Sequence, residues 1–146
     1  MIVGELKAAP QNGAKTMRKL TRALAHCGTP TPERASAGWD RVAFTNYIPV
    51  SVGDGAKMPK TQAMWQQAEA ELPAILNRLS PAVVVVLGLT MWNRMPATQS
   101  FVSDLVQGYR LASGETAMCY AHPHPAYGPG WEYYATAIDK AFEGLV

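Results

Sequence analysis

The chain has 146 residues, which is enough for one domain with one sizeable hydrophobic core. Its 13 basic and 11 acidic side chains give a net charge of +2, which neither requires nor excludes nucleic acid as a partner. The longest apolar run, residues 82–87, is too short to cross a bilayer and no signal peptide opens the chain, so we expect no membrane partner. Cys27 and Cys119 are far apart in sequence, which argues against a cysteine-based metal site and favours a reducing, cytoplasmic location.

The first third of the chain predicts a strand, a helix and a loop. A short strand is expected at Ile2-Val3. A helix is expected over residues 14–27, where apolar side chains recur every three or four residues, and Gly28 is suited to end it. The polar, proline-rich stretch that follows, through Gly38, predicts a loop.

The middle of the chain predicts a second strand and a long helix. Residues 41–48 are rich in aromatic and β-branched side chains, which is typical of a strand. Residues 50–60 contain Gly53, Asp54, Gly55 and Pro59 and predict an exposed loop. Helical periodicity returns at Thr61 and continues to Pro81, and Pro73 should kink or restart this helix.

The last third begins with a continuously apolar strand at residues 82–87, as expected for a central parallel strand covered on both faces. A short helix over residues 90–94 is expected next, with Thr90 as its cap. Residues 96–113 are hard to assign from their pattern. A strand at residues 116–120 and a helix at residues 131–145 complete the chain.

Strands that alternate with helices predict a single α/β domain over residues 1–146 with a mainly parallel sheet. Three of these strands end in residues that can carry chemistry, at Gly4-Glu5, Asn46-Tyr47 and His122-Pro123. Because parallel strands end at the same edge of a sheet, these residues should lie near one another.

The run Ala121-His122-Pro123-His124-Pro125 stands where the last strand ends and the chain turns. Proline fixes φ and lacks an amide donor, so this loop should be stiff. A stiff loop that holds two imidazoles at the carboxyl end of a strand is a candidate ligand site. A metal site there lacks an evident third ligand, so we expect neither a metal nor another cofactor.

The ordered set of these motifs resembles the uracil-DNA glycosylase superfamily. The matching segments span nearly the whole chain and are Ile2-Val3-Gly4-Glu5, Phe44-Thr45-Asn46-Tyr47-Ile48-Pro49, Leu79-Ser80-Pro81 leading into Val83-Val84-Val85-Val86-Leu87-Gly88, and His122-Pro123. The resemblance implies an α/β/α fold of three layers around a four-stranded, mainly parallel sheet.

The resemblance also implies an activity, namely flipping a deaminated base out of DNA and hydrolysing its N-glycosidic bond. His122 matches the imidazole that stabilises charge on the departing base, and Glu5 matches the position that helps to place the attacking water. Asn46 matches the side chain that reads the edge of the base, with Tyr47 beside it in the base-binding motif.

DNA is the partner that the resemblance implies, and four further residues are candidates for contacting it. Pro123 to Tyr127 would be the loop that enters the groove, with Tyr127 as a wedge and His124 beside it. Lys57 and Lys60 flank the glycine-rich loop and could contact phosphates.

Two alternatives remain open at the level of sequence. The first motif continues as Leu6-Lys7-Ala8-Ala9-Pro10, and His124 stands where the family has serine, so the chain could be a catalytically degenerate module that binds a base, a nucleic acid or a protein. An unrelated flavodoxin-like nucleotide-binding domain is the other alternative. The oligomeric state is not indicated by the sequence.

Overall fold

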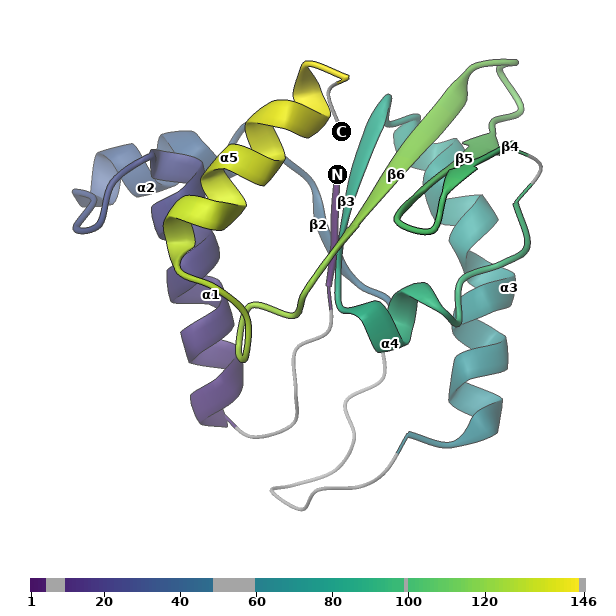
Figure 1. Cartoon of the computed structure of the whole chain (residues 1–146), viewed down its shortest axis with the longest axis horizontal. Coiled ribbons are helices and arrows are strands. Elements are labelled where there is room, and N and C mark those ends of the chain that lie inside the picture. The colour runs from purple at the N-terminus through teal and green to yellow at the C-terminus, as the bar shows by residue number, and fades with distance from the viewer. Residues whose placement is uncertain (5–9, 49–59, 99, 145–146) are drawn as a thin grey trace.

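The structure is a computed structural model, and it describes residues 1–4, 10–48, 60–98 and 100–144. Within these ranges the chain forms a six-stranded mixed sheet with helices on both faces (Figure 1). The elements in chain order are β1 (Ile2–Gly4), α1 (Pro10–Ala25), α2 (Pro32–Trp39), β2 (Phe44–Asn46), α3 (Gln62–Leu79), β3 (Val83–Leu87), α4 (Leu89–Trp92), β4 (Ser100–Ser103), β5 (Val106–Arg110), β6 (Thr116–His122) and α5 (Trp131–Phe142).

The strand order is β2-β1-β3-β6-β5-β4. The pairs β1–β2, β1–β3 and β3–β6 are parallel, whereas β5 pairs antiparallel with β6 and β4 pairs antiparallel with β5. The α/β class expected from the sequence is therefore confirmed. The sheet is wider than the four strands expected, because a hairpin extends it beyond β6.

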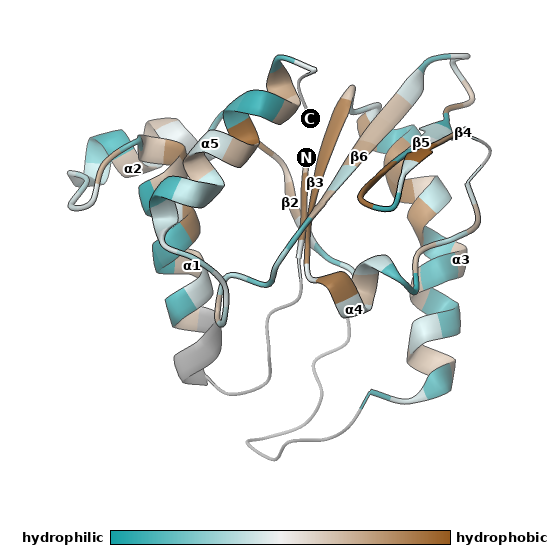
Figure 2. Ribbon diagram, in the orientation of Figure 1, coloured by the Kyte–Doolittle hydropathy of each residue, from teal (hydrophilic) through white to brown (hydrophobic). Residues whose placement is uncertain are grey.

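Each face of the sheet carries its own apolar core. Leu20 and Leu24 of α1 and Tyr134 and Ile138 of α5 pack on one face. On the other face, α3 and α4 supply the buried Leu72, Leu76, Met91 and Trp92. The central strand β3 serves both cores, and Figure 2 shows it apolar along its length. This burial on both sides is why the valine run has no polar alternation.

The helix α2 lies in the segment where the sequence predicted a loop. Its start is fixed by Thr31, whose hydroxyl accepts the backbone N–H of Arg34, and by Pro32 in the first turn. Serine, threonine and proline at these positions are typical of a helix start, so the signal was present but short. Contacts with α1 stabilise this eight-residue helix, and Gly38 allows the approach because an added Cβ would lie 3.1 Å from Leu24.

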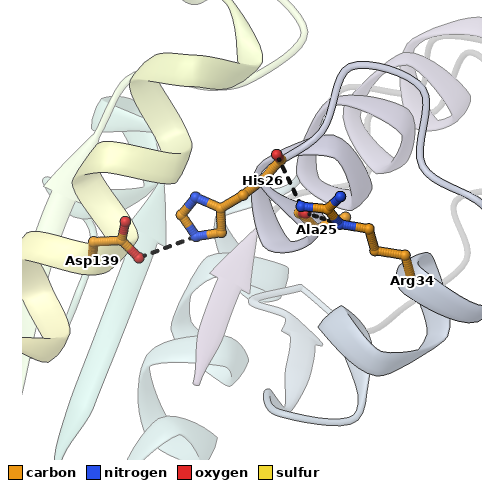
Figure 3. Close-up of polar contacts among 4 residues, drawn as sticks. All are labelled: Ala25, His26, Arg34 and Asp139. Atoms are coloured by element: carbon orange, nitrogen blue, oxygen red, sulfur yellow. Dashed lines mark hydrogen bonds and ion pairs between the residues drawn. The ribbon is translucent and has the colours of Figure 1, made fainter.

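The helix α1 ends three residues before the glycine expected to stop it. His26 takes the left-handed conformation with φ of +49°, and the amides of His26 and Cys27 donate to the carbonyls of Ala23 and Arg22. This is the Schellman arrangement, with histidine in the position that usually holds glycine. Figure 3 shows that Arg34 from α2 closes the same helix end, since its Nε donates to Ala25 O at 2.8 Å.

Two other expectations differ from the structure. The helix α3 continues through Pro73 as one element, with Pro73 exposed on its outer side. Residues 96–113, whose sequence pattern indicated no clear element, contain the β4–β5 hairpin. The pairing of β5 with β6 is long-range, so it leaves little local signal in the sequence. No helix within the described ranges is long and apolar enough to span a membrane.

Candidate functional site

The carboxyl ends of the parallel strands meet at one edge of the sheet, as the sequence predicted. Gly4 at the end of β1 pairs with Asn46 at the end of β2, and Leu87 at the end of β3 pairs with His122 at the end of β6. In Figure 1 this edge lies at the bottom of the sheet, beside α4 and the loop that follows β6. Asn46, Gly4 and His122 therefore lie along one edge.

Asn46 and His122 also belong to the same face of the sheet. Asn46 stands two residues after Phe44 in β2, and His122 stands two residues after Tyr120 in β6. The side chains of Phe44 and Tyr120 both belong to the core under α1 and α5. Alternate residues of a strand face the same side, so Asn46 and His122 project toward α1 and α5. The strands β1 and β3 lie between β2 and β6. Three interstrand spacings of about 4.8 Å therefore separate the backbones of Asn46 and His122 by about 14 Å.

Gly4 lies between them and leaves room for an aromatic ring. A Cβ on Gly4 would come within 3.2 Å of Cε2 and 3.3 Å of Cζ of Phe44, so the ring of Phe44 covers this glycine. The Phe44 ring is partly buried and meets Trp39 edge-on at 6.1 Å. Phe44 is thus a residue near the candidate site that the sequence analysis did not select.

His122 is partly buried and held by a tyrosine of α5. Its Nδ1 lies 3.0 Å from the hydroxyl oxygen of Tyr133, and the two rings meet edge-on with centroids 5.7 Å apart. Burial lowers the pKa of the His122 imidazole below its ordinary value of 6.5, which favours the neutral form of the ring. Within the described part of the chain, its Nε2 makes no hydrogen bond.

Tyr133 was not selected from the sequence, and only a weak signal pointed to it. It lies 11 residues after His122, near the start of the helix that follows the histidine loop. In the sequence it is one of several aromatic residues of the helix expected over residues 131–145. The structure separates them, because Tyr134 is fully buried and Tyr133 is 40% exposed.

The loop after β6 is held by Lys19 of α1. The Lys19 ammonium donates to the carbonyl oxygens of Pro125 at 2.6 Å, Gly128 at 3.2 Å and Pro129 at 2.6 Å. Burial, together with repulsion from Lys15, lowers the pKa of Lys19. The proline-rich loop is therefore cross-linked to a helix more than a hundred residues away in sequence.

Further hydrogen bonds fix the inside of this loop. Tyr134 donates its hydroxyl to Pro123 O at 3.0 Å, and the backbone N–H of Ala126 donates to His124 Nδ1 at 3.1 Å. Gly128 closes against Tyr134, since an added Cβ would lie 2.1 Å from the tyrosine hydroxyl. These hydrogen bonds and close contacts restrain the loop from inside.

The two candidate DNA-contacting residues of the loop lie together at its outer side. Tyr127 is 68% exposed, and its ring centroid lies 6.0 Å from that of His124. His124 is partly buried. An exposed aromatic ring on a rigid loop can stack on another ring without a large loss of conformational freedom.

Tyr47 and Lys60 lie elsewhere. Tyr47 is 3% exposed in the core under α3, its hydroxyl donates to Arg94 O at 2.9 Å, and burial raises its pKa to about 12. Lys60 lies 5.5 Å from the ring centroid of Trp65, and burial lowers its pKa to about 8. Both lie on the α3 side of the sheet, so the structure does not bring them to the face that carries Asn46 and His122.

Glu5 and Lys57 lie outside the described residues. Within the described residues, no group of three or more His, Cys, Asp or Glu side chains could hold a metal ion. Cys27 and Cys119 are free thiols, and burial raises the pKa of the Cys119 thiol to about 12. A thiol so resistant to ionisation is a poor nucleophile.

His122 also lines a cavity of about 200 Å³ between α5 and the strands β5 and β6. Asn46 does not line this cavity. In comparisons with known proteins, the chain matches no family model and no curated protein sequence.

Proposed function

We propose that this chain is a base-excision type of DNA glycosylase, acting on uracil or another deaminated base. The observation that carries the proposal is the alignment of Asn46 and His122 on one face at the carboxyl edge of parallel strands. Open α/β sheets bind ligands at this edge. The proposed fold is the three-layer arrangement of that superfamily, with the β4–β5 hairpin as an addition.

The roles proposed for the two side chains follow from their chemistry. The amide of Asn46 has both a donor and an acceptor, and can pair with the adjacent carbonyl and N–H of uracil. When Tyr133 donates its hydroxyl to Nδ1 of His122, the imidazole proton resides on Nε2. A neutral imidazole then presents an N–H to the oxygen that gains negative charge as the base departs.

Hydrolysis adds water to the sugar carbon and breaks its bond to the base nitrogen, which receives a proton. We propose Glu5 for placing that water. The exposed Tyr127 ring would fill the space of the flipped base, with His124 beside it, and we propose Lys57 for contacting the phosphates.

A module that binds without cleaving is the second candidate. The observation that favours it is the cavity at His122, which Asn46 does not line. In that case Asn46 and His122 serve different ligands, and the chain binds a ligand in the cavity at His122 without cleaving it.

Incubation with a single-stranded oligonucleotide containing one uracil, followed by alkali, separates the two candidates because alkali breaks the strand only at an abasic site. The glycosylase proposal expects strand cleavage by the wild-type protein, and at least tenfold slower cleavage by His122→Ala and Asn46→Ala. His26→Ala is the matched control, since His26 is exposed and lies just after the C-terminal end of α1, at the end of that helix opposite to the strand edge. Failure to cleave uracil, hypoxanthine and xanthine substrates would refute the enzyme, and a filter-binding assay with the same oligonucleotides would then test the module.

A further inference from the structure

The cavity between α5 and the strands β5 and β6 has the features of a small-molecule site that adjoins the strand edge at His122. It has a volume of about 200 Å³, and its walls include Val106, Tyr120, Ala137 and Ala141. These four side chains are at least 90% buried. The cavity is therefore part of the packed interface between the helix and the sheet, with Leu105, 50% exposed, at its mouth.

The shape of the cavity follows from the spacing of small residues on α5. Tyr133, Ala137 and Ala141 are four residues apart and share one side of the helix. Eight residues at 1.5 Å each give the cavity a length of about 12 Å along the helix. Alanine at the second and third positions leaves space where larger side chains would pack against β6.

Three side chains with polar groups lie toward the ends of this cavity, and the wall residue Tyr120 also carries a hydroxyl. His122 and Tyr133, joined through Nδ1 and the tyrosine hydroxyl at 3.0 Å, line one end. Lys140 lines the other end and is exposed. Among the described residues Lys140 makes no ion pair, and the neighbouring Asp139 pairs instead with His26 at 3.3 Å (Figure 3).

The volume of the cavity, its wall residues and the polar side chains at its ends together indicate the class of ligand that it would bind. A cavity of roughly 150 Å³ holds one benzene ring, so this one accommodates a single ring with substituents. Apart from Tyr120, the wall side chains are apolar and offer few partners for the several polar edges of a nucleobase, which favours a hydrocarbon ring. The unpaired lysine favours a carboxylate at one end, and the histidine and tyrosine favour a hydrogen-bonding group at the other.

We propose that this cavity binds a monocyclic aromatic carboxylate, with the carboxylate at Lys140 and a hydroxyl at the opposite end of the ring bonded to His122 or Tyr133. The cavity shares His122 with the strand edge, but the proposal does not rest on the glycosylase activity, because Asn46 does not line the cavity. A ligand seated there contacts His122, so its binding would also alter the end of β6 that faces the strand edge.

Titration of the ¹⁵N-labelled protein with 4-hydroxybenzoate tests the proposal. We expect saturable binding, with the largest amide shifts at Tyr133, Ala137 and Lys140. Lys140→Gln should weaken binding about fivefold, as expected for one exposed charge pair. Lys15→Gln, an exposed lysine of α1, should leave binding unchanged. The uncharged 4-hydroxybenzyl alcohol should bind more weakly than 4-hydroxybenzoate.

Ala137→Leu should abolish binding because its side chain fills the cavity. Its fold is checked by circular dichroism, and if it does not fold, Lys140→Gln and the uncharged probe carry the test. No saturation up to millimolar 4-hydroxybenzoate, largest shifts elsewhere in the protein, or equal binding by Lys140→Gln would each overturn the proposal. Tighter binding of uracil at the same amides would overturn the ligand class.

Discussion

Lys19→Met is the most informative test of how the histidine loop is held. Methionine keeps most of the aliphatic stem of lysine but removes the ammonium that donates to Pro125, Gly128 and Pro129. Hydrogen bonds to a charged group contribute roughly 1.5–3 kcal/mol each, but the loop carbonyls regain water when the lysine is lost, and Lys19 no longer bears a desolvation cost. We therefore expect the free energy of unfolding to fall by about 2 kcal/mol.

The thermal shift follows from the size of the chain. An unfolding entropy of about 2.1 cal/mol/K per residue over 146 residues gives about 0.3 kcal/mol/K, so the expected loss lowers Tm by about 7 °C. Urea and thermal unfolding followed by circular dichroism measure both quantities. Amide hydrogen exchange adds a local readout, since Tyr127 and Gly128 donate to His124 O in the turn and should exchange faster in the variant.

Lys15→Met is the matched control, because Lys15 is exposed on the same helix and its charge lowers the pKa of Lys19. It should cost no stability and leave exchange in the loop unchanged. If Lys19→Met stays within about 0.5 kcal/mol of the wild type, with unchanged exchange at Tyr127 and Gly128, the loop is not held by this lysine.

Two further predictions concern histidines. His26→Gly should raise the free energy of unfolding by up to about 1 kcal/mol, since glycine adopts the left-handed conformation more readily and the exposed pair with Asp139 contributes little; a loss of stability in urea unfolding would contradict this. For His122, the folded chain binds the proton less readily than the unfolded chain, so the free energy of unfolding should fall as pH decreases through about 6.5. This decrease should be smaller in His122→Asn, and an equal decrease in both proteins between pH 7.5 and 5 would show that burial of His122 does not govern it.

The features that could be predicted from sequence are those with a strong local pattern. The valine run of β3 predicts a strand buried on both faces because no polar residue interrupts it. The apolar periodicity of residues 62–79 predicts α3, and its Ala68, Leu72 and Leu76 are indeed buried. The meeting of Gly4, Asn46 and His122 at one edge follows from parallel pairing alone.

The features that were missed depend on contacts between distant segments. The helix α2 is short and is stabilised against α1, and the β4–β5 hairpin depends on pairing with β6. Four of its strand residues, Ser100 to Ser103, are exposed, so no apolar face revealed β4. Tyr47 follows Asn46 directly, yet the alternation of the strand sends the two side chains to opposite faces.

The sequence by itself determined that this chain alternates helices with parallel strands, and that a stiff histidine loop follows the last of them. Only the tertiary structure decided what surrounds that loop. Tyr133 reaches His122 because α5 turns back over β6, and Lys19 reaches the loop carbonyls because α1 packs beside α5. Local pattern specifies which segments form strands and helices, but the hydrogen-bond partner of a side chain depends on how those segments pack.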